Sequence, residues 1–126
     1  MLLTTLSQEQ HGLGLEMAAL YLAIEGANPR LLGVDTPADQ IVEAAVALSV
    51  RVLGLSVSRA SDPDTTRERI RWILSKLPTS IEVWLGGKGA PALKPPDARV
   101  FVTRSWTDVD RELFRLRTSP KNNSAA

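Results

Sequence analysis

The sequence contains a single histidine, His11, in the run LSQEQHGLGLEM over residues 6–17, two positions after a glutamate and beside two glycines. An unprotonated imidazole nitrogen is a good ligand for a transition metal. In an extended chain, Glu9 lies on the same side as His11, and its carboxylate can accept the other ring N–H, which fixes the tautomer. Glu9 and His11 are therefore a candidate ligand pair, although a lone histidine is more commonly structural.

Two other groups of residues have types suited to holding a ligand. A serine cluster, Ser56-Val57-Ser58-Arg59-Ala60-Ser61, follows one apolar run, and the pair Gly86-Gly87 ends another. Glycine lets a ligand approach the backbone where any Cβ would obstruct it. Taken singly, such glycines are typical of strand-to-helix turns, so their meaning depends on whether the fold brings the three groups together.

The elements that must position these groups follow from the apolar runs. Five short runs predict strands: Leu2–Leu6, Arg30–Val34, Val50–Val57, Ile81–Leu85 and Arg99–Thr103. Their continuous hydrophobicity indicates parallel strands that are covered on both faces. Helical patterns between them predict an α/β fold, a flavodoxin-like (Rossmann-like) five-stranded parallel sheet of order 2-1-3-4-5 with helices on both faces.

Four helices are expected, each with an apolar stripe at helical spacing. The stripes are Leu13, Met17, Leu20 and Ile24; then Ile41, Val42, Ala45 and Leu48; then Ile70, Ile73, Leu74 and Leu77; and last Val109, Leu113, Phe114 and Leu116. The last three stripes are expected to face inward. Expected N-terminal signals are Thr36-Pro37, Asp62-Pro63 and Thr107. Arg67, Glu68, Arg69 and Arg71 are expected to face water, and Lys88–Lys94 has room for one or two further turns.

This strand order has a consequence for function. The chain reverses direction across the sheet between the first and third strands, and ligands bind outside the carboxyl ends of strands at such a point. The loops after the first, third and fourth strands should therefore meet there. They contain His11, the serine cluster and Gly86-Gly87.

Composition excludes several classes of protein. The 126 residues predict one domain, over 1–117, followed by a polar tail, 118–126, that is expected to be disordered. The chain has no cysteine, which rules out disulfides and thiolate sites, and its net charge of +1 does not favour a polyanion-binding surface. No membrane span or leader is visible, so a cytoplasmic location is expected. The residues that define phospho-receiver domains, flavodoxins and nucleotide-binding loops are missing.

Together the three groups resemble a known signature. Glu9-x-His11-x-x-Gly14, Ser56-x-Ser58 and Gly86-Gly87 are similar to Asp-x-His-x-x-Gly, Ser-x-Leu and Gly-Gly of cobalamin-binding domains, with the family's spacings of 41 and 27 residues between them. Glutamate replaces the usual aspartate, and Ser58 replaces the usual leucine. The small polar side chain of Ser58 is still expected to line the pocket that receives part of the cofactor. The run Glu9–Leu15 and the later run Gly33-Val34-Asp35-Thr36-Pro37 most resemble the C-terminal sensory domain of light-sensing MerR-class cobalamin-dependent transcription regulators.

The resemblance implies a cofactor and a site. The cofactor is cobalamin (adenosylcobalamin, methylcobalamin or hydroxocobalamin), whose cobalt His11 would ligate from below after displacing the cofactor's own base. Ser56 would hydrogen-bond the displaced base, and Trp106 is a candidate to border the pocket for the tail. The implied cofactor-binding residues are Glu9, Gln10, His11, Gly12, Leu13, Gly14, Leu55, Ser56, Val57, Ser58, Gly86, Gly87 and Ser105.

Three functions remain open at this stage. The chain is a sensory module of a light- or B12-responsive transcription regulator, a corrinoid carrier domain or subunit of a methyltransferase or mutase, or a degenerate domain that only contacts other proteins. The residues include no evident catalytic acid, base or nucleophile, so the chain itself is not expected to be an enzyme. A helical bundle and DNA-binding segments are expected outside it, on the same protein or on partner subunits. Direct DNA binding by this chain is not expected.

Overall fold

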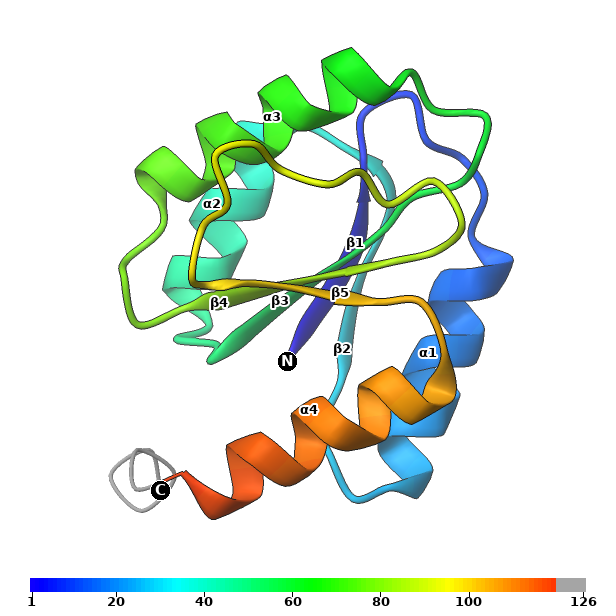
Figure 1. Ribbon diagram of the computed structural model, residues 1–126, viewed down its shortest axis with the longest axis vertical. Helices are drawn as coiled ribbons and strands as arrows, with labels where there is room; N and C mark the ends of the chain where they lie inside the picture. Colours follow the sequence, from blue (N-terminus) through cyan, green and yellow to red (C-terminus); the bar gives the residue numbers. More distant parts are fainter. Residues whose placement is uncertain (120–126) are drawn as a thin grey trace.

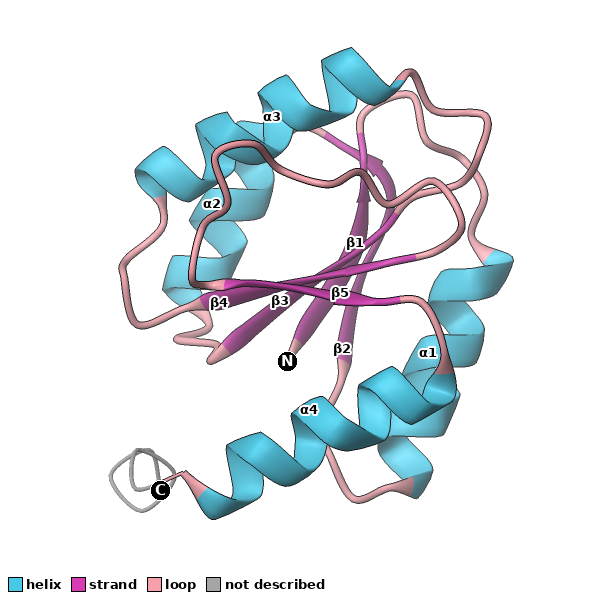
Figure 2. Cartoon of the chain, viewed as in Figure 1, coloured by secondary structure: helices cyan, strands magenta, loops and turns pink. Residues whose placement is uncertain are grey.

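A computed structural model describes residues 1–119 of the chain, in which strands and helices alternate (Figures 1 and 2). The elements are β1 (Leu2–Leu6), α1 (Leu13–Ile24), β2 (Arg30–Thr36), α2 (Ala38–Ala47), β3 (Val52–Ser56), α3 (Pro63–Lys76), β4 (Glu82–Gly86), β5 (Val100–Thr103) and α4 (Trp106–Thr118).

The five strands form one sheet of order β2-β1-β3-β4-β5, and every neighbouring pair is parallel. Helices α2 and α3 cover one face of this sheet, and α1 and α4 cover the other (Figure 1). The flavodoxin-like order and the helices on both faces, which the sequence predicted, are confirmed.

The central strands supply a hydrophobic core on each face of the sheet. In β3, Leu53 and Leu55 belong to the core under α2 and α3, whereas Val52 belongs to the core under α1 and α4. In β4, Val83 and Trp84 divide in the same way. Because successive side chains of a strand point to opposite faces, a strand covered on both sides must be apolar throughout. This explains the continuous apolar runs.

The helix starts differ from two of the predictions. Thr36 is the last residue of β2, and α2 begins at Ala38 after Pro37. Helix α4 is capped by Ser105, not Thr107, because the extended backbone of Ser105 lets its Oγ accept from the N–H of Asp108, whose carboxylate bonds back. Asp62 caps α3 as predicted. No helix forms over Lys88–Lys94, which is irregular.

In α1 the residues that pack on the sheet are Leu15 and Leu22, and the four residues of the expected stripe are exposed. Three side chains outside α1 lie differently than predicted. Leu48, the residue that follows α2, and Phe114, within α4, are exposed instead of facing inward. Arg69 does not project into water; it is half-buried against the loop after β1.

The predicted tail lies largely beyond the described part of the chain. Thr118 still belongs to α4, and residues 120–126 lie outside the residues that the structure describes. Within residues 1–119, no helix is long and apolar enough to cross a membrane.

Loops at the carboxyl edge of the sheet pack backbone against backbone. A Cβ on Gly87, whose φ is +91°, would lie 2.2 Å from the carbonyl oxygen of Val57, and one on Gly89 would lie 1.9 Å from that of Ser58. The N–H of Gly89 also donates to Val57 O over 3.0 Å. The loops after β3 and β4 can therefore meet only because these two positions carry no side chain.

We expect Gly89→Ala to destabilise the domain by about 1–3 kcal/mol, because neither backbone can yield to the added carbon without strain. Gly86→Ala is the matched control, since its Cβ would lie at an ordinary 3.5 Å from Thr103 Oγ1; it should change stability by less than about 0.5 kcal/mol. Urea unfolding monitored by tryptophan fluorescence measures both. Equal stabilities of the two variants would contradict the close approach.

Candidate functional site

Glu9 is a buried carboxylate that joins two loops. The residue is 4% exposed. Its Oε1 accepts from the backbone N–H of His11 at 3.3 Å and from His11 Nδ1 at 2.9 Å. Its Oε2 accepts from Ser58, through the backbone N–H at 3.0 Å and Oγ at 2.9 Å, and from the hydroxyl of Ser61. The loop after β1 is thus fastened to the loop after β3 by one side chain.

These hydrogen bonds decide the ionisation of Glu9. Burial by itself would raise the pKa of this carboxyl group, but the hydrogen bonds from Ser61, Ser58 and His11 outweigh it and lower the pKa to about 2. Glu9 is therefore ionised at neutral pH and can only accept hydrogen bonds.

His11 is oriented by this carboxylate. Because ionised Glu9 accepts at Nδ1, a neutral imidazole carries its proton there, and its lone pair is on Nε2. The side chain of His11 is 70% exposed, and within residues 1–119 nothing hydrogen-bonds Nε2. The Glu9–His11 contact predicted from their spacing is confirmed, and the arrangement presents one imidazole lone pair outward.

The loop that carries this pair is held from three sides. Thr5 Oγ1 donates to the carbonyl of Glu9 at 2.6 Å and accepts from the N–H of Asp35 at 2.8 Å. The carboxylate of Asp35 accepts from the N–H of Gln8 at 2.7 Å. Arg69 of α3 donates to the carbonyl of Ser7 at 2.6 Å. The ligand pair therefore sits on a loop whose path is fixed by β1, β2 and α3.

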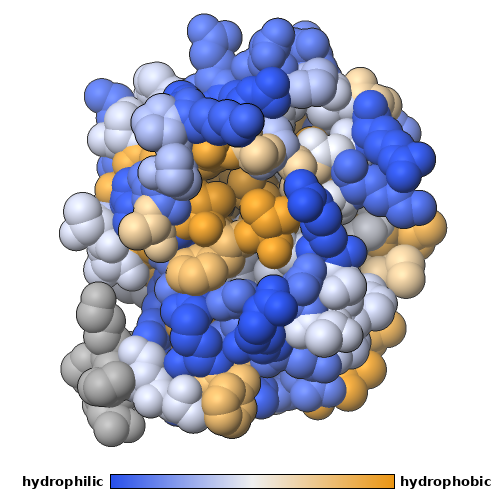
Figure 3. All heavy atoms as spheres, viewed as in Figure 1, coloured by the Kyte–Doolittle hydropathy of each residue, from blue (hydrophilic) through white to orange (hydrophobic). Residues whose placement is uncertain are grey.

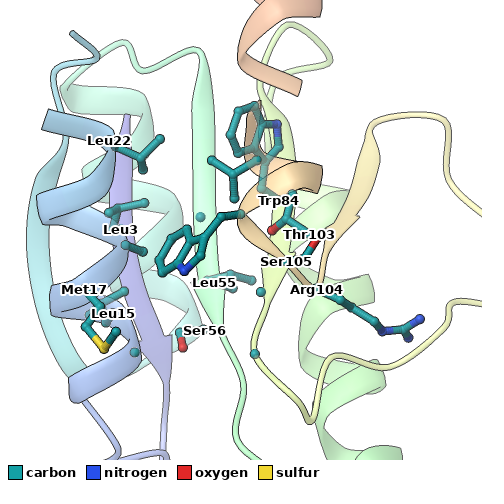
Figure 4. Close-up of a pocket in the computed structure, with 17 residues that line it drawn as sticks. Leu3, Leu15, Met17, Leu22, Leu55, Ser56, Trp84, Thr103, Arg104 and Ser105 are labelled. Carbon is teal, nitrogen blue, oxygen red and sulfur yellow. The ribbon is translucent and has the colours of Figure 1, made fainter. Parts of the chain in front are cut away.

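A cavity of about 400 Å³ lies between α1 and α4, over the sheet (Figure 4). It is lined mainly by apolar side chains and bare backbone: Leu3, Gly14, Leu15, Met17, Ala18, Leu22, Gly54, Leu55, Ser56, Trp84, Gly86, Gly87, Thr103, Arg104, Ser105, Trp106 and Val109. It includes residues at the carboxyl ends of β3, β4 and β5 and reaches Leu3 and Leu22 deeper along the sheet. We call this cavity the slot.

An aromatic pair links the two helices that flank the slot. Tyr21 of α1 stacks on Trp106 of α4 with ring centroids 4.6 Å apart, and the hydroxyl of Tyr21 donates to Asp110. This hydrogen bond raises the pKa of Tyr21 to about 12. Trp106, which was a candidate to border the pocket, also lines the slot. The pair sets the spacing of α1 and α4 at this point.

The predicted site residues fall into three groups in the structure. Those that line the slot are Gly14, Leu55, Ser56, Gly86, Gly87 and Ser105. Those joined by hydrogen bonds around the carboxylate are Glu9, His11 and Ser58, so Ser58 does not line the slot as expected. Those outside both groups are Gln10, Gly12, Leu13 and Val57. Of these, Gln10 and Leu13 are exposed, and the backbone of Val57 packs on Gly87.

Several contributors to the site were not assigned from the sequence. Ser61 completes the shell of Glu9, and its position in the serine cluster was the available signal. Asp35 holds the loop, and its place in the run Gly33–Pro37, which resembles the regulators, was the available signal. Arg69 holds the loop as well, but nothing in a solvated helix pattern distinguishes it. The deep lining residues, such as Leu3 and Trp84, lie in apolar strand runs, and the sequence does not distinguish them from ordinary core residues.

Comparisons with known proteins bear on this geometry. No family model matches the chain. It is 32% identical over 106 residues to the HTH-type transcriptional repressor CarH of Myxococcus xanthus, covering 82% of this chain and 36% of CarH. Its fold is similar to the crystal structure of a cobalamin-binding protein from Desulfitobacterium hafniense, with a TM-score of 0.70 and 20% identity, over 90% of this chain and 57% of that one.

The resemblance to cobalamin-binding domains is confirmed. Neither similar protein is named as an enzyme, in agreement with the expectation for this chain. The chain spans only about a third of the length of CarH, so it corresponds to one part of that repressor.

The low pKa of Glu9 predicts how the stability of the domain without cofactor depends on pH. A carboxyl group whose pKa is lower in the folded state stabilises it above the unfolded pKa, near 4.5, and this contribution is lost as the pH falls towards 2. The free energy of unfolding of the wild type should therefore fall towards that of Glu9→Gln by about 3 kcal/mol between pH 5 and pH 2. Urea titrations of both proteins across this range measure the difference. A difference that does not vary with pH would contradict an ionised Glu9.

Proposed function

We propose that this chain is a cobalamin-binding module that holds the corrinoid base-off with His11 as its lower axial ligand, and that it is the sensory part of a light- or B12-responsive transcription regulator. The observation that carries this proposal is the oriented Glu9–His11 pair beside an apolar slot. Gly14, three residues after His11, and Ser56, two before Ser58, both line that slot.

The residues present fit the cofactor. A volume of about 400 Å³, a mostly apolar lining and a few polar groups such as Ser56 and Thr103 are typical of a site for a small organic group. The displaced nucleotide tail would enter this slot, and the hydroxyl of Ser56 is available to hydrogen-bond its base. When bound, cobalamin supplies cobalt, a transition metal that imidazole ligates well.

The chain's own contribution is to orient the ligand and set its basicity. Ionised Glu9 keeps the proton of His11 on Nδ1, which directs the lone pair of Nε2 outward and strengthens it as a donor. Ser58 and Ser61 keep Glu9 ionised and in place. Each hydroxyl therefore acts on the metal ligand through the carboxylate.

The regulatory role rests on the similarity to CarH, a transcriptional repressor. Because the chain spans 36% of CarH, DNA recognition and any helical bundle belong to other segments or subunits in this proposal. The arginines of α3 and α4 are interleaved with acids and form pairs such as Arg67–Asp64 and Arg111–Asp108, which disfavours a DNA-binding surface on the chain itself. A second candidate function is that of a corrinoid carrier of a methyltransferase or mutase, which the likeness in fold to a cobalamin-binding protein also supports.

The test is a titration of the purified 126-residue chain with hydroxocobalamin. We expect retention on gel filtration, and, after reduction, a paramagnetic-resonance spectrum whose axial nitrogen comes from a histidine. His11→Ala should abolish that coupling. Glu9→Gln should weaken binding by roughly 10–100-fold, the usual cost of losing the partner of a ligating histidine. Glu16→Gln, which removes an exposed carboxylate of α1, is the matched control and should bind like the wild type.

Two results would contradict this mode of binding. One is a spectrum of the cofactor with its own base still attached. The other is unchanged affinity and coupling in His11→Ala. Labelling the chain with ¹⁵N-histidine separates the two nitrogen sources directly, because only one histidine is present.

A second test addresses the slot. Gly14 lies in the first turn of α1, where a Cβ would sit 3.6 Å from Ser56 Oγ, so Gly14→Ala fits and should stabilise the helix by about 0.5–1 kcal/mol. Gly14→Leu should fold as well, but its side chain would occupy the slot and lower cobalamin affinity about tenfold or more. Isothermal titration of both variants, with urea unfolding alongside, distinguishes the two effects. Tight binding by a folded Gly14→Leu would place the tail elsewhere.

A further inference from the structure

The lining of the slot contains one charged residue, Arg104, which lies between β5 and α4. The rest of the lining is apolar, bare backbone or uncharged, as at Leu55, Trp84 and Thr103. Leu55 and Trp84 are buried, whereas Arg104 is exposed, so Arg104 lies at the mouth of the slot. In Figure 4 its side chain extends away from Leu55 and the deeper part of the slot. A single positive charge therefore lies where a ligand enters.

The main chain of Arg104 is fixed by the start of α4. Its N–H donates to Oδ2 of Asp108 at 2.8 Å, and the same oxygen accepts from the N–H of Ser105 at 3.2 Å. The other oxygen of Asp108 accepts from Arg111 at 2.9 Å, so the charge of this carboxylate is already compensated. The side chain of Arg104 therefore starts from a defined position, and Asp108 does not neutralise its guanidinium.

The guanidinium of Arg104 does not hold the fold together. It makes one hydrogen bond, from Nη2 to the carbonyl of Ala90 at 3.4 Å, and within residues 1–119 it forms no ion pair. By contrast, Arg115 is paired with two carboxylates, those of Glu82 and Glu112. A hydrogen bond of 3.4 Å is weak. The guanidinium of Arg104 can therefore turn to a better acceptor without losing a strong contact.

Neither helix that flanks the slot brings another positive charge into it. Among its 12 residues α1 has one charged side chain, Glu16. Figure 3 shows hydrophobic residues along the edge of the molecule where α1 lies in Figure 1. In α4, Arg111 and Arg115 lie outside the lining and are paired with acids. Within the described part of the chain, an anion in the mouth of the slot would therefore meet Arg104.

The nucleotide tail of cobalamin carries such an anion. Its phosphodiester has one negative charge and connects the ribose that bears the base to the linker from the corrin ring. With the base in the slot and the ring outside at His11, the phosphodiester lies between them, in the mouth. A guanidinium donates two parallel hydrogen bonds to phosphate oxygens, and an apolar surrounding strengthens the attraction between the two charges.

On the basis of the proposed function, we propose that Arg104 binds the phosphodiester of the nucleotide tail. The slot then recognises the tail in two parts, the base by its apolar interior and the phosphate by its single cation. A corrinoid without the nucleotide would gain nothing from Arg104. The residue therefore makes the domain selective for complete cobalamin over corrinoids that lack the nucleotide.

The test compares methylcobalamin with methylcobinamide, which has the same ring and upper ligand but lacks the phosphodiester, ribose and base. Isothermal titration in the dark measures the affinity of the 126-residue chain for each corrinoid. Arg104→Gln should raise the dissociation constant for methylcobalamin about 3–10-fold, between the effect of an exposed ion pair and that of a buried charged hydrogen bond. The same variant should bind methylcobinamide within about twofold of the wild type, because there is no phosphate to contact.

Two further variants separate a direct contact from the overall field of the protein. Lys88→Gln is the matched control, since Lys88 is exposed on the loop after β4 and does not line the slot. It removes the same charge and should change the affinity for methylcobalamin less than about twofold. Arg104→Lys keeps the charge but loses the planar pair of donors, so it should retain more affinity than Arg104→Gln. All three variants should unfold in urea at the midpoint of the wild type, because neither side chain is buried.

Three results would overturn the role of Arg104 alone, while the visible spectrum of the wild-type complex still shows cobalt released from its own base. Arg104→Gln could bind methylcobalamin as tightly as the wild type, lose equal affinity for both corrinoids, or lose no more than Lys88→Gln. A wild-type chain that does not bind methylcobalamin, or binds it with that base still attached, would overturn the proposed mode of binding as well.

Discussion

The site depends on one buried negative charge. An isolated ionised carboxylate in a protein interior is very costly, and it persists only where hydrogen-bond donors surround it. Glu9 meets this condition with five hydrogen bonds, from His11, Ser58 and Ser61. The loops after β1 and β3 must therefore stay together for the charge to remain buried. The same interaction that stabilises these loops also sets the tautomer of His11, so the structure and the chemistry of the site have a common cause.

The slot depends on a different constraint, which is the separation of α1 and α4. These helices cover one face of the sheet, and Tyr21 and Trp106 stack across the space between them. Bare backbone at Gly14 and Gly54 leaves volume that larger side chains would fill. On the other face, α2 and α3 close over a packed core. The domain thus has one face built for its own stability and one with room for a ligand.

Helix α1 connects these features to the surface. It begins directly after the His11 loop, and Leu15, Met17 and Leu22 line the slot. Its outer side carries the exposed apolar residues Leu13, Leu20 and Ile24. A partner bound to the outer side would therefore contact the same helix as a ligand in the slot. Such a shared rigid element is one physical route by which two sites can influence each other.

The sequence alone determined the strand order, the contact between Glu9 and His11, and the convergence of the serine and glycine loops. These follow from local rules, because a fully buried strand must be apolar throughout and parallel strands bring their carboxyl ends to one edge. Only the tertiary structure decided which side of α1 is buried, because a helix that is apolar all round has no periodicity to choose between faces. The structure likewise decided that Ser58 faces Glu9 rather than the slot, and that Arg69 holds a loop rather than facing water. Those contacts join residues about fifty or more positions apart, and their geometry depends on how the loops pack.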